Sequence, residues 1–258
     1  MNTTMNIAIA ITALLPVSLL FGKARFGRIN QFVELISTFW HEMSHAISAS
    51  IMYGEVDSIR VEPGGRVREV QGAQSYSYVY SASGVTHYRT NGSGIRRFFI
   101  TGAGYAGPTL LGLAMIFTWS TSRLAIFGYV WGVILALFFI VSRGVYAFLI
   151  NLVSFLLVTA PVWPDSFASF VPFLDDVRYI APTLLISTLL VYGLKDSVGI
   201  FRTMRQIARG EVPATGDSDT EKMAQMTGIP ATFWAISYVV LSIVGLMAIP
   251  GLLIWQTA

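Results

Sequence analysis

Long apolar runs separated by polar connections make up most of this chain. A helix needs about 20 apolar residues to cross the hydrocarbon core of a bilayer, with a lower limit of roughly 17. Runs close to this length occur at residues 6–22, 31–53, 98–119, 124–141, 145–162, 180–194 and 233–255. The pattern predicts an all-α polytopic membrane protein with about six to seven transmembrane helices, folded as a single integral membrane domain over residues 1–258.

The first break in the apolar pattern is residues 54–97, an insertion with strand character. Apolar and polar side chains alternate over residues 56–61 and again over 66–70, as in half-buried strands. The Pro-Gly-Gly sequence at 63–65 is a turn signal, so we expect a small β-hairpin directly after the second apolar run. The Ser/Tyr alternation over residues 74–80 predicts a further strand.

The second break, residues 195–232, is predicted to be a polar loop. Within it, Ser218 followed by Glu221 has the spacing of a capping box and predicts the start of a helix. Most of the 17 Lys and Arg residues fall in connections on the side of the membrane that carries both polar stretches. The positive-inside rule therefore places these stretches in the cytoplasm.

The composition agrees with a membrane protein and narrows its partners. Of the residues, 54% are hydrophobic and only 12% are charged, whereas soluble domains average about 25% charged residues. The mean hydropathy is +0.62. The absence of cysteine excludes disulfides and thiolate metal ligands. The cations form no patch interleaved with aromatic residues, so we expect the lipid bilayer and no nucleic acid as a partner.

The second apolar run contains the motif His-Glu-x-x-His. On a helix, residues four apart share a face, so His41 and His45 can direct their imidazoles at one Zn²⁺. Glu42 lies beside that metal and can act as general base toward a water molecule that zinc activates. The motif could be a chance pattern on a solvated helix, but the run is strongly apolar and holds two of the three histidines of the chain. The third, His87, fits a surface loop better than a ligand.

The depth of the motif also follows from the sequence. His45 lies eight residues before the cytoplasmic end of its run at Tyr53, which is about 12 Å along a helix. The predicted metal site therefore lies inside the membrane, nearer its cytoplasmic face.

Four features together resemble the site-2 protease family of intramembrane zinc metalloproteases, and within it the smaller, B-like branch. The first two are the motif His41-Glu42-Met43-Ser44-His45-Ala46 and the predicted hairpin after it. The third is the glycine-rich segment Gly102-Ala103-Gly104-Tyr105-Ala106-Gly107-Pro108. The fourth is a late stretch in which Asp217-Ser218-Asp219 is followed by Met226-Thr227-Gly228-Ile229-Pro230. The resemblance covers roughly residues 32–246.

This resemblance implies a zinc metalloendopeptidase that cleaves a transmembrane or membrane-proximal peptide bond. Its partner would be a membrane-embedded protein substrate. In that case His41 and His45 are zinc ligands, Glu42 is the general base, and the hairpin edge pairs with an unwound substrate strand.

The third zinc ligand is the point at which this chain departs from the wider family, which supplies an Asp in Leu-Asp-Gly. No Asp-Gly occurs in the sequence, although a catalytic zinc usually has three protein ligands. Asp196, at the end of a predicted span on the side of His45, is the favoured candidate because ligands must converge at one depth. Asp219 and Asp165 are the alternatives, and a helix-capping role would explain Asp219 equally well.

Two other functions remain open at the level of the sequence. A membrane scaffold or chaperone could retain the fold without cleaving peptides, although it would have no reason to keep all three motif residues. A metal or proton transporter could use intramembrane His, Glu and Asp. The absence of an internal repeat disfavours this last class.

Overall fold

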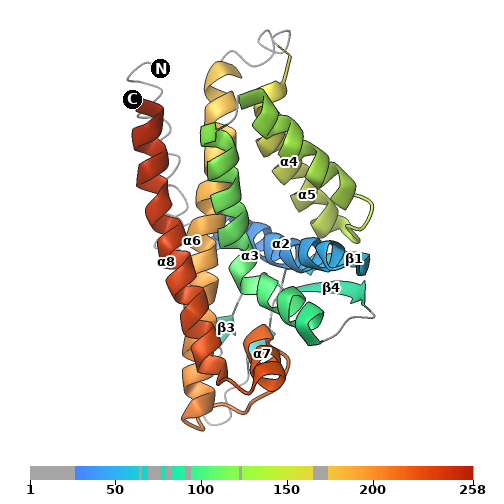
Figure 1. Ribbon diagram of the computed structural model, residues 1–258, viewed down its shortest axis with the longest axis vertical. Helices are drawn as coiled ribbons and strands as arrows, with labels where there is room; N and C mark the ends of the chain where they lie inside the picture. The colour runs from blue at the N-terminus through green and yellow to red at the C-terminus, as the bar shows by residue number, and fades with distance from the viewer. Residues whose placement is uncertain are drawn as a thin grey trace.

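The computed structural model describes residues 27–63, 66–68, 77–79, 83–90, 94–121, 124–164 and 174–257 (Figure 1). Most of them are helical, as predicted. The helices are α2 (Gly27–Ile51), α3 (Gly94–Thr121), α4 (Leu124–Phe138), α5 (Val145–Thr159), the 3-10 turn η1 (Ala160–Val162), α6 (Leu174–Ala208), α7 (Asp219–Thr227) and α8 (Ala231–Thr257). The predicted span at residues 6–22 lies outside the described residues.

Three helical segments in the described part of the chain are long and apolar enough to cross a membrane. They are Gly94–Trp119, Val145–Val162 and Val177–Ala208, and two shorter apolar helices cover Ala125–Phe138 and Ala231–Met247. Helix α2, predicted as a span at residues 31–53, is in neither group, because it carries the polar and ionisable residues of the motif region. The predicted count of six to seven spans is therefore not confirmed.

Helix α6 extends into the stretch predicted as a polar loop over residues 195–232. Residues 195–208 continue α6 without a break. Ile200 and Met204, four residues apart and therefore on one helix face, are buried against Ala235 of α8. This apolar face keeps the segment helical, and the irregular part of the predicted loop is confined to the connections on either side of α7.

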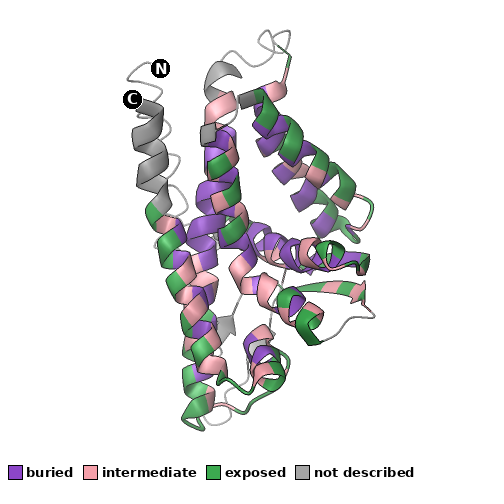
Figure 2. Cartoon of the chain, in the orientation of Figure 1, coloured by how far each residue is buried: buried purple, intermediate pink, exposed green. Residues whose placement is uncertain are grey.

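The helices differ in direction as well as in composition. In Figure 1, α6 and α8 run side by side along the length of the molecule, α4 and α5 form an antiparallel pair, and α2 crosses at a large angle to α6 and α8. Helix α2 packs against α3, α5 and α6 and against strands β1 (Glu55–Glu62) and β4 (Ser83–Arg89). Phe39, Trp40 and Met43 have no exposed surface, and α2 is correspondingly buried over most of its length in Figure 2.

The strands pair differently from the predicted hairpin. Strand β1 pairs with β4, and β2 (Arg66–Arg68) pairs with β3 (Ser77–Val79), both antiparallel. The prediction that 56–61 pairs with 66–70 is therefore wrong. Glu62 faces Ser83 at the end of the first ladder and Arg66 faces Val79 at the start of the second. The second ladder therefore continues the register of the end of the first, and the Pro-Gly-Gly signal does not mark the reversal of a β1–β2 hairpin.

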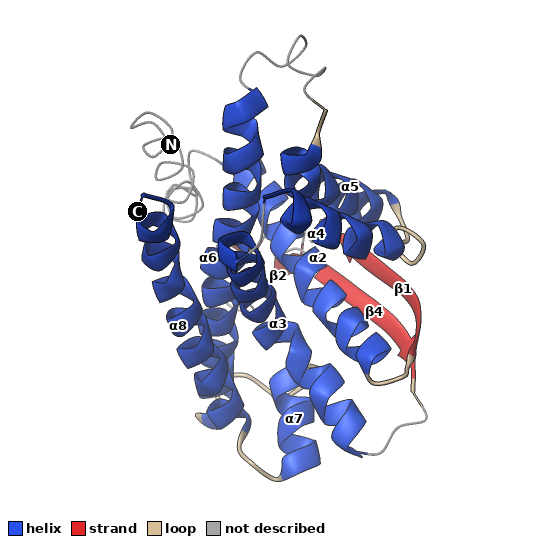
Figure 3. Cartoon of the chain, turned by 45° about the horizontal axis from the view of Figure 1, so that its top comes forward, coloured by secondary structure: helices blue, strands red, loops and turns tan. Residues whose placement is uncertain are grey.

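The two edges of the β1–β4 pair have different surroundings. Ile59 of β1 donates its amide to the carbonyl of Val141 and accepts the amide of Arg143, both at 2.8 Å, so the α4–α5 connection covers this edge. No strand that the structure describes pairs with the other edge of β4. Figure 3 shows the β1–β4 pair lying along α2, and β4 is the strand whose residues reach the site described below.

Candidate metal centre

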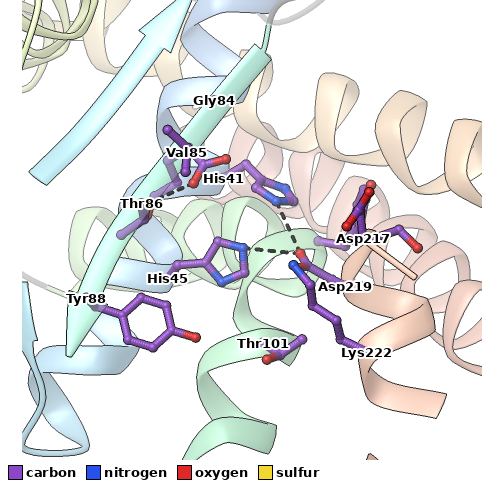
Figure 4. A pocket seen from close by; sticks show the side chains of 13 residues that line it. His41, His45, Gly84, Val85, Thr86, Tyr88, Thr101, Asp217, Asp219 and Lys222 are labelled. Atoms are coloured by element: carbon purple, nitrogen blue, oxygen red, sulfur yellow. Dashed lines mark hydrogen bonds and ion pairs between the residues drawn. The ribbon is translucent and has the colours of Figure 1, made fainter. Parts of the chain in front are cut away.

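The two histidines of the motif lie one helical turn apart on α2 and face one cavity (Figure 4). Their ring centroids are 5.0 Å apart. Nδ1 of His45 lies 2.7 Å from the carbonyl oxygen of Ile100 on α3. When Nδ1 donates this hydrogen bond, the lone pair of Nε2 is free to bind a metal, as is usual for metal-ligating histidines. His41 is held by an edge-to-face contact with Tyr105, with ring centroids 4.8 Å apart.

A third ionisable side chain, Asp219, completes the cluster. Its Oδ2 lies 3.3 Å from Nε2 of His41 and 3.2 Å from Nε2 of His45. Asp219 is the first residue of α7, where Ser218 and Glu221 form the predicted capping box. The cap fixes the start of the helix, and the packing of α7 against α3 brings that start over the histidine pair. The capping residue Ser218 and the residue that faces the histidines, Asp219, are thus neighbours in the chain with different contacts.

The electrostatics of Asp219 suit a metal ligand. Burial alone would raise the pKa of this carboxyl, but the facing imidazoles of His41 and His45 outweigh the burial and hold the pKa below its usual range. Asp219 is therefore ionised at neutral pH. Its Oδ2 is buried, and among the described residues it faces Nε2 of His41 and Nε2 of His45 without a well-aligned hydrogen bond to either. A buried anionic oxygen requires a proton or a cation beside it, and either protonated imidazoles or a metal ion bound between the three side chains would meet this requirement.

Gly104 of α3 leaves the space that a metal ion would require. A methyl group at this position would collide at once with Asp219 Oδ2, His45 Nε2 and His41 Nε2. The three ligand atoms lie within 4.8 Å of one another. In a tetrahedral zinc site with bonds of about 2.1 Å, ligand atoms are roughly 3.4 Å apart, close to the 3.2 and 3.3 Å contacts of Asp219. The donor set and its spacing fit zinc.

Glu42 lies next to this cluster, and a residue of β4 holds its side chain in position. The hydroxyl of Thr86 lies 2.8 Å from both Oε2 and the backbone carbonyl of Glu42 and donates to them. Strand β4 approaches so closely that a side chain at Gly84 would collide with the Glu42 side chain. The metal cluster, Glu42 and β4 enclose a cavity of about 270 Å³. The arrangement can bind a metal, hold a carboxylate beside it and present a strand edge to a ligand.

The favoured third ligand, Asp196, lies elsewhere. It is in the middle of the continuous helix α6 and accepts a hydrogen bond of 2.8 Å from Ser37 of α2. Its neighbour Lys195 forms an ion pair with Glu34. The described residues with clustered ligand atoms are His41, His45 and Asp219, without Asp196. The ranking by depth did not anticipate that α7 folds back onto α3 and brings Asp219 to the histidines. Asp165 lies outside the described residues, and His87 is exposed on β4.

Several residues of the site were not predicted individually. Gly104 stood out only as part of the glycine-rich segment that carries the resemblance. A side chain at Gly107 would collide with Ser44 of α2, whereas one at Gly104 would enter the cluster of His41, His45 and Asp219. Thr86 lies in a stretch with no recognisable motif, and only the pairing of β4 with β1 brings it to Glu42.

Comparison of the sequence with known protein families identifies the family of this chain. The profile described as Peptidase M50B-like matches residues 4–249, which is nearly the whole chain. No curated protein and no solved structure matches the chain. The description refers to the site-2 protease family, which is zinc-dependent, in agreement with the resemblance carried by the motif and the glycine-rich segment. The chain belongs to the Peptidase M50B-like family, which is the site-2 protease family.

Proposed function

We propose that this protein is an intramembrane zinc metalloendopeptidase in which His41, His45 and Asp219 hold the metal. The observation that carries the proposal is the convergence of two imidazoles and one ionised carboxylate on the space left by Gly104. Three protein ligands with a further position open to the cavity are typical of catalytic zinc sites, and structural sites use four. Zinc in such a site acts as a Lewis acid toward a carbonyl group and lowers the pKa of water.

Glu42 supplies the proton transfers of this proposed reaction. Its carboxylate lies in the metal cavity and is held in place by Thr86. There it can take the proton of an attacking water molecule and return a proton to the leaving amine of the cleaved peptide. Because Thr86 donates to Oε2, Oε1 is the oxygen best placed to accept the proton. General base catalysis of this kind contributes roughly 10²–10⁴-fold to a rate.

The edge of β4 is the proposed site for the substrate, a membrane-embedded protein segment. Gly84, Val85 and Thr86 of this strand line the same cavity as Glu42 and the histidines. A transmembrane helix must unwind before one of its peptide bonds is accessible, and an unwound segment can then pair with a strand edge. Since the α4–α5 connection covers the β1 edge, β4 is the edge that remains for this pairing.

We also propose that the protein is multi-pass and that the site lies toward the cytoplasmic face. The positively charged connections that the sequence assigns to the cytoplasm include the β-insertion, the α4–α5 connection and the segment carrying α7. These three are associated in the fold, since β1 pairs with the α4–α5 connection and Asp219 of α7 contacts the histidines. Their common location supports one cytoplasmic assembly at the inner ends of the apolar helices.

Substitution of the general base tests the proposal. The purified protein is reconstituted in vesicles with a library of single-pass transmembrane segments, and new amino termini are identified by mass spectrometry. Glu42→Gln should retain about one zinc per chain and lower cleavage at least about 100-fold. Glu55→Gln, on the exposed start of β1, is the matched control and should cleave like the wild type.

Two results would overturn the function. Cleavage by Glu42→Gln at the wild-type rate would remove this residue from the mechanism. Zinc binding by the wild type without any cleavage across the library would favour the alternatives, a membrane scaffold or chaperone or a metal or proton transporter.

A further inference from the structure

A second cavity, of about 450 Å³, lies on the other side of the contact between α2 and α3. It is lined by residues of α2, α3, α7 and α8, and none of them lines the metal cavity. Nearly all of its walls are apolar, including Ile51, Phe99 and Leu110. The residues that α3 and α8 contribute fall within the apolar segments Gly94–Trp119 and Ala231–Met247. The cavity therefore opens among helices that face lipid.

One polar group in this apolar cavity has no partner. Tyr238 lines the cavity and is only 5% exposed. Its hydroxyl is buried and makes no hydrogen bond with the described residues. A buried hydroxyl without a partner costs roughly 1–3 kcal/mol, so its presence here points to a ligand that carries a hydrogen-bond acceptor.

The surroundings of Tyr238 indicate the class of that ligand. The hydroxyl lies near Gly102 of α3. The cavity walls around it are apolar, so a ligand that places an acceptor at the depth of Gly102 would continue between these walls as an apolar chain. A phospholipid has both parts, an ester carbonyl and an acyl chain attached to it.

We propose that this cavity binds one acyl chain of a membrane phospholipid, whose ester carbonyl accepts a hydrogen bond from Tyr238. Its volume is in the range of small-molecule sites, about 300–1,000 Å³. A helix about 10 Å across would fill it with roughly a single turn, which is too little to hold a transmembrane segment. The bilayer around α3 and α8 provides the lipid directly.

The bound lipid would lie close to the metal centre without entering it. The ring of Tyr238 packs on Tyr105 with centroids 5.6 Å apart, and Tyr105 contacts the ring of His41. Ser44 and Gly107, which line the cavity, meet where α2 and α3 touch. An effect of the lipid on cleavage would rest on the proposed protease function, whereas lipid binding itself does not depend on it.

Photolabelling of the full chain tests the proposal. The protein is reconstituted in nanodiscs of phosphatidylcholine that contain a small fraction of phosphatidylcholine with a diazirine at the end of one acyl chain. After irradiation, labelled residues are mapped by mass spectrometry. Leu110, Leu111 and Leu241 should be labelled about tenfold more than Val133 and Leu137, which are exposed on α4.

Three variants keep this test specific. Ala106→Phe fills the cavity and should lower its labelling about tenfold, while Ala136→Phe adds the same bulk to an exposed position of α4 and should leave it unchanged. Tyr238→Phe preserves the shape, and the lipid retained through detergent purification should fall about fivefold, the effect of one neutral hydrogen bond.

Equal labelling of the cavity and of α4, or full cavity labelling in Ala106→Phe, would overturn the proposal. Loss of labelling on addition of a transmembrane peptide, without loss on addition of unlabelled phosphatidylcholine, would also overturn it, because a helix would then be the occupant. None of these outcomes depends on peptide cleavage, so a failed protease function and a failed lipid site would be distinguishable.

Discussion

Helix α2 contributes to two clusters of ionisable groups, and they differ in how their carboxylates are paired. Near the start of α2, Glu34 pairs with Lys195 and Ser37 donates to Asp196. Further along, His41 and His45 face Asp219, whose Oδ2 has no hydrogen bond within the described residues. In the α2–α6 cluster the carboxylates face an ammonium group and a hydroxyl, whereas in the histidine cluster the described groups that face Asp219 Oδ2 are the two imidazoles, which are themselves proposed metal ligands.

This difference explains why an acid in an apolar helix is a weak guide to a metal ligand. Asp196 required an explanation, and the α2–α6 cluster supplies one, since a hydroxyl donor and a nearby ammonium group stabilise a buried carboxylate. Asp219 had a sufficient explanation as a capping-box neighbour, yet its carboxylate points away from the cap toward the histidines. The partners of each carboxylate, and not its depth along a helix, distinguish the structural role of Asp196 from the metal-binding role proposed for Asp219.

The largest expected difference is in zinc binding, between substitution of Asp219 and substitution of Asp196. Asp219→Ala should weaken zinc binding more than about 100-fold, because even the loss of an outer-shell partner costs 10–100-fold. Asp196→Ala should keep about one zinc per chain. Metal content and zinc titration of the detergent-purified variants measure this, with Asp57→Ala, exposed on β1 and outside the metal cavity, as control. Loss of zinc in Asp196→Ala and not in Asp219→Ala would reverse the assignment of the two clusters.

A smaller effect is expected when the ligands are kept and the space between them is filled. Gly104→Ala should lower zinc affinity at least about tenfold, because its methyl group would enter the ligand cluster. Gly199→Ala is the matched control, as a helical glycine with open space around its Cα. It should bind zinc normally and gain about 0.5–1 kcal/mol in unfolding free energy. Normal zinc affinity in Gly104→Ala would show that the metal binds elsewhere.

The smallest effect concerns the α2–α6 cluster, where stability should change and metal binding should not. Lys195→Met leaves the largely buried Glu34 without its cation and should lower the unfolding free energy by about 2 kcal/mol. Arg202→Met, exposed on the same helix, should stay within about 0.5 kcal/mol of the wild type. Thermal unfolding in detergent measures both. A loss of zinc in Lys195→Met would mean that the clusters are coupled and that their separation here is wrong.

Predictions from the sequence succeeded where the relevant contacts are local. The mainly helical class follows from the apolar runs, and the start of α7 follows from Ser218 and Glu221, three residues apart. Strands β1, β2 and β3 were found from alternation within residues 54–97, but strand β4 and the pairing of the strands were not. Pairing depends on which distant strand is available, and a Pro-Gly-Gly turn signal near β1 was stronger than any signal linking β1 to β4.

The sequence by itself determined the presence of a histidine pair with an adjacent carboxylate on one helix, because a spacing of four residues matches the helical repeat. It also determined that this helix belongs to a largely apolar chain. Only the tertiary structure decided that Asp219 joins the histidines, that β4 lies against Glu42 and that Gly104 leaves the space between the ligands. These are contacts between segments far apart in the chain. They depend on how α3 and α7 pack, which no local pattern of residues specifies.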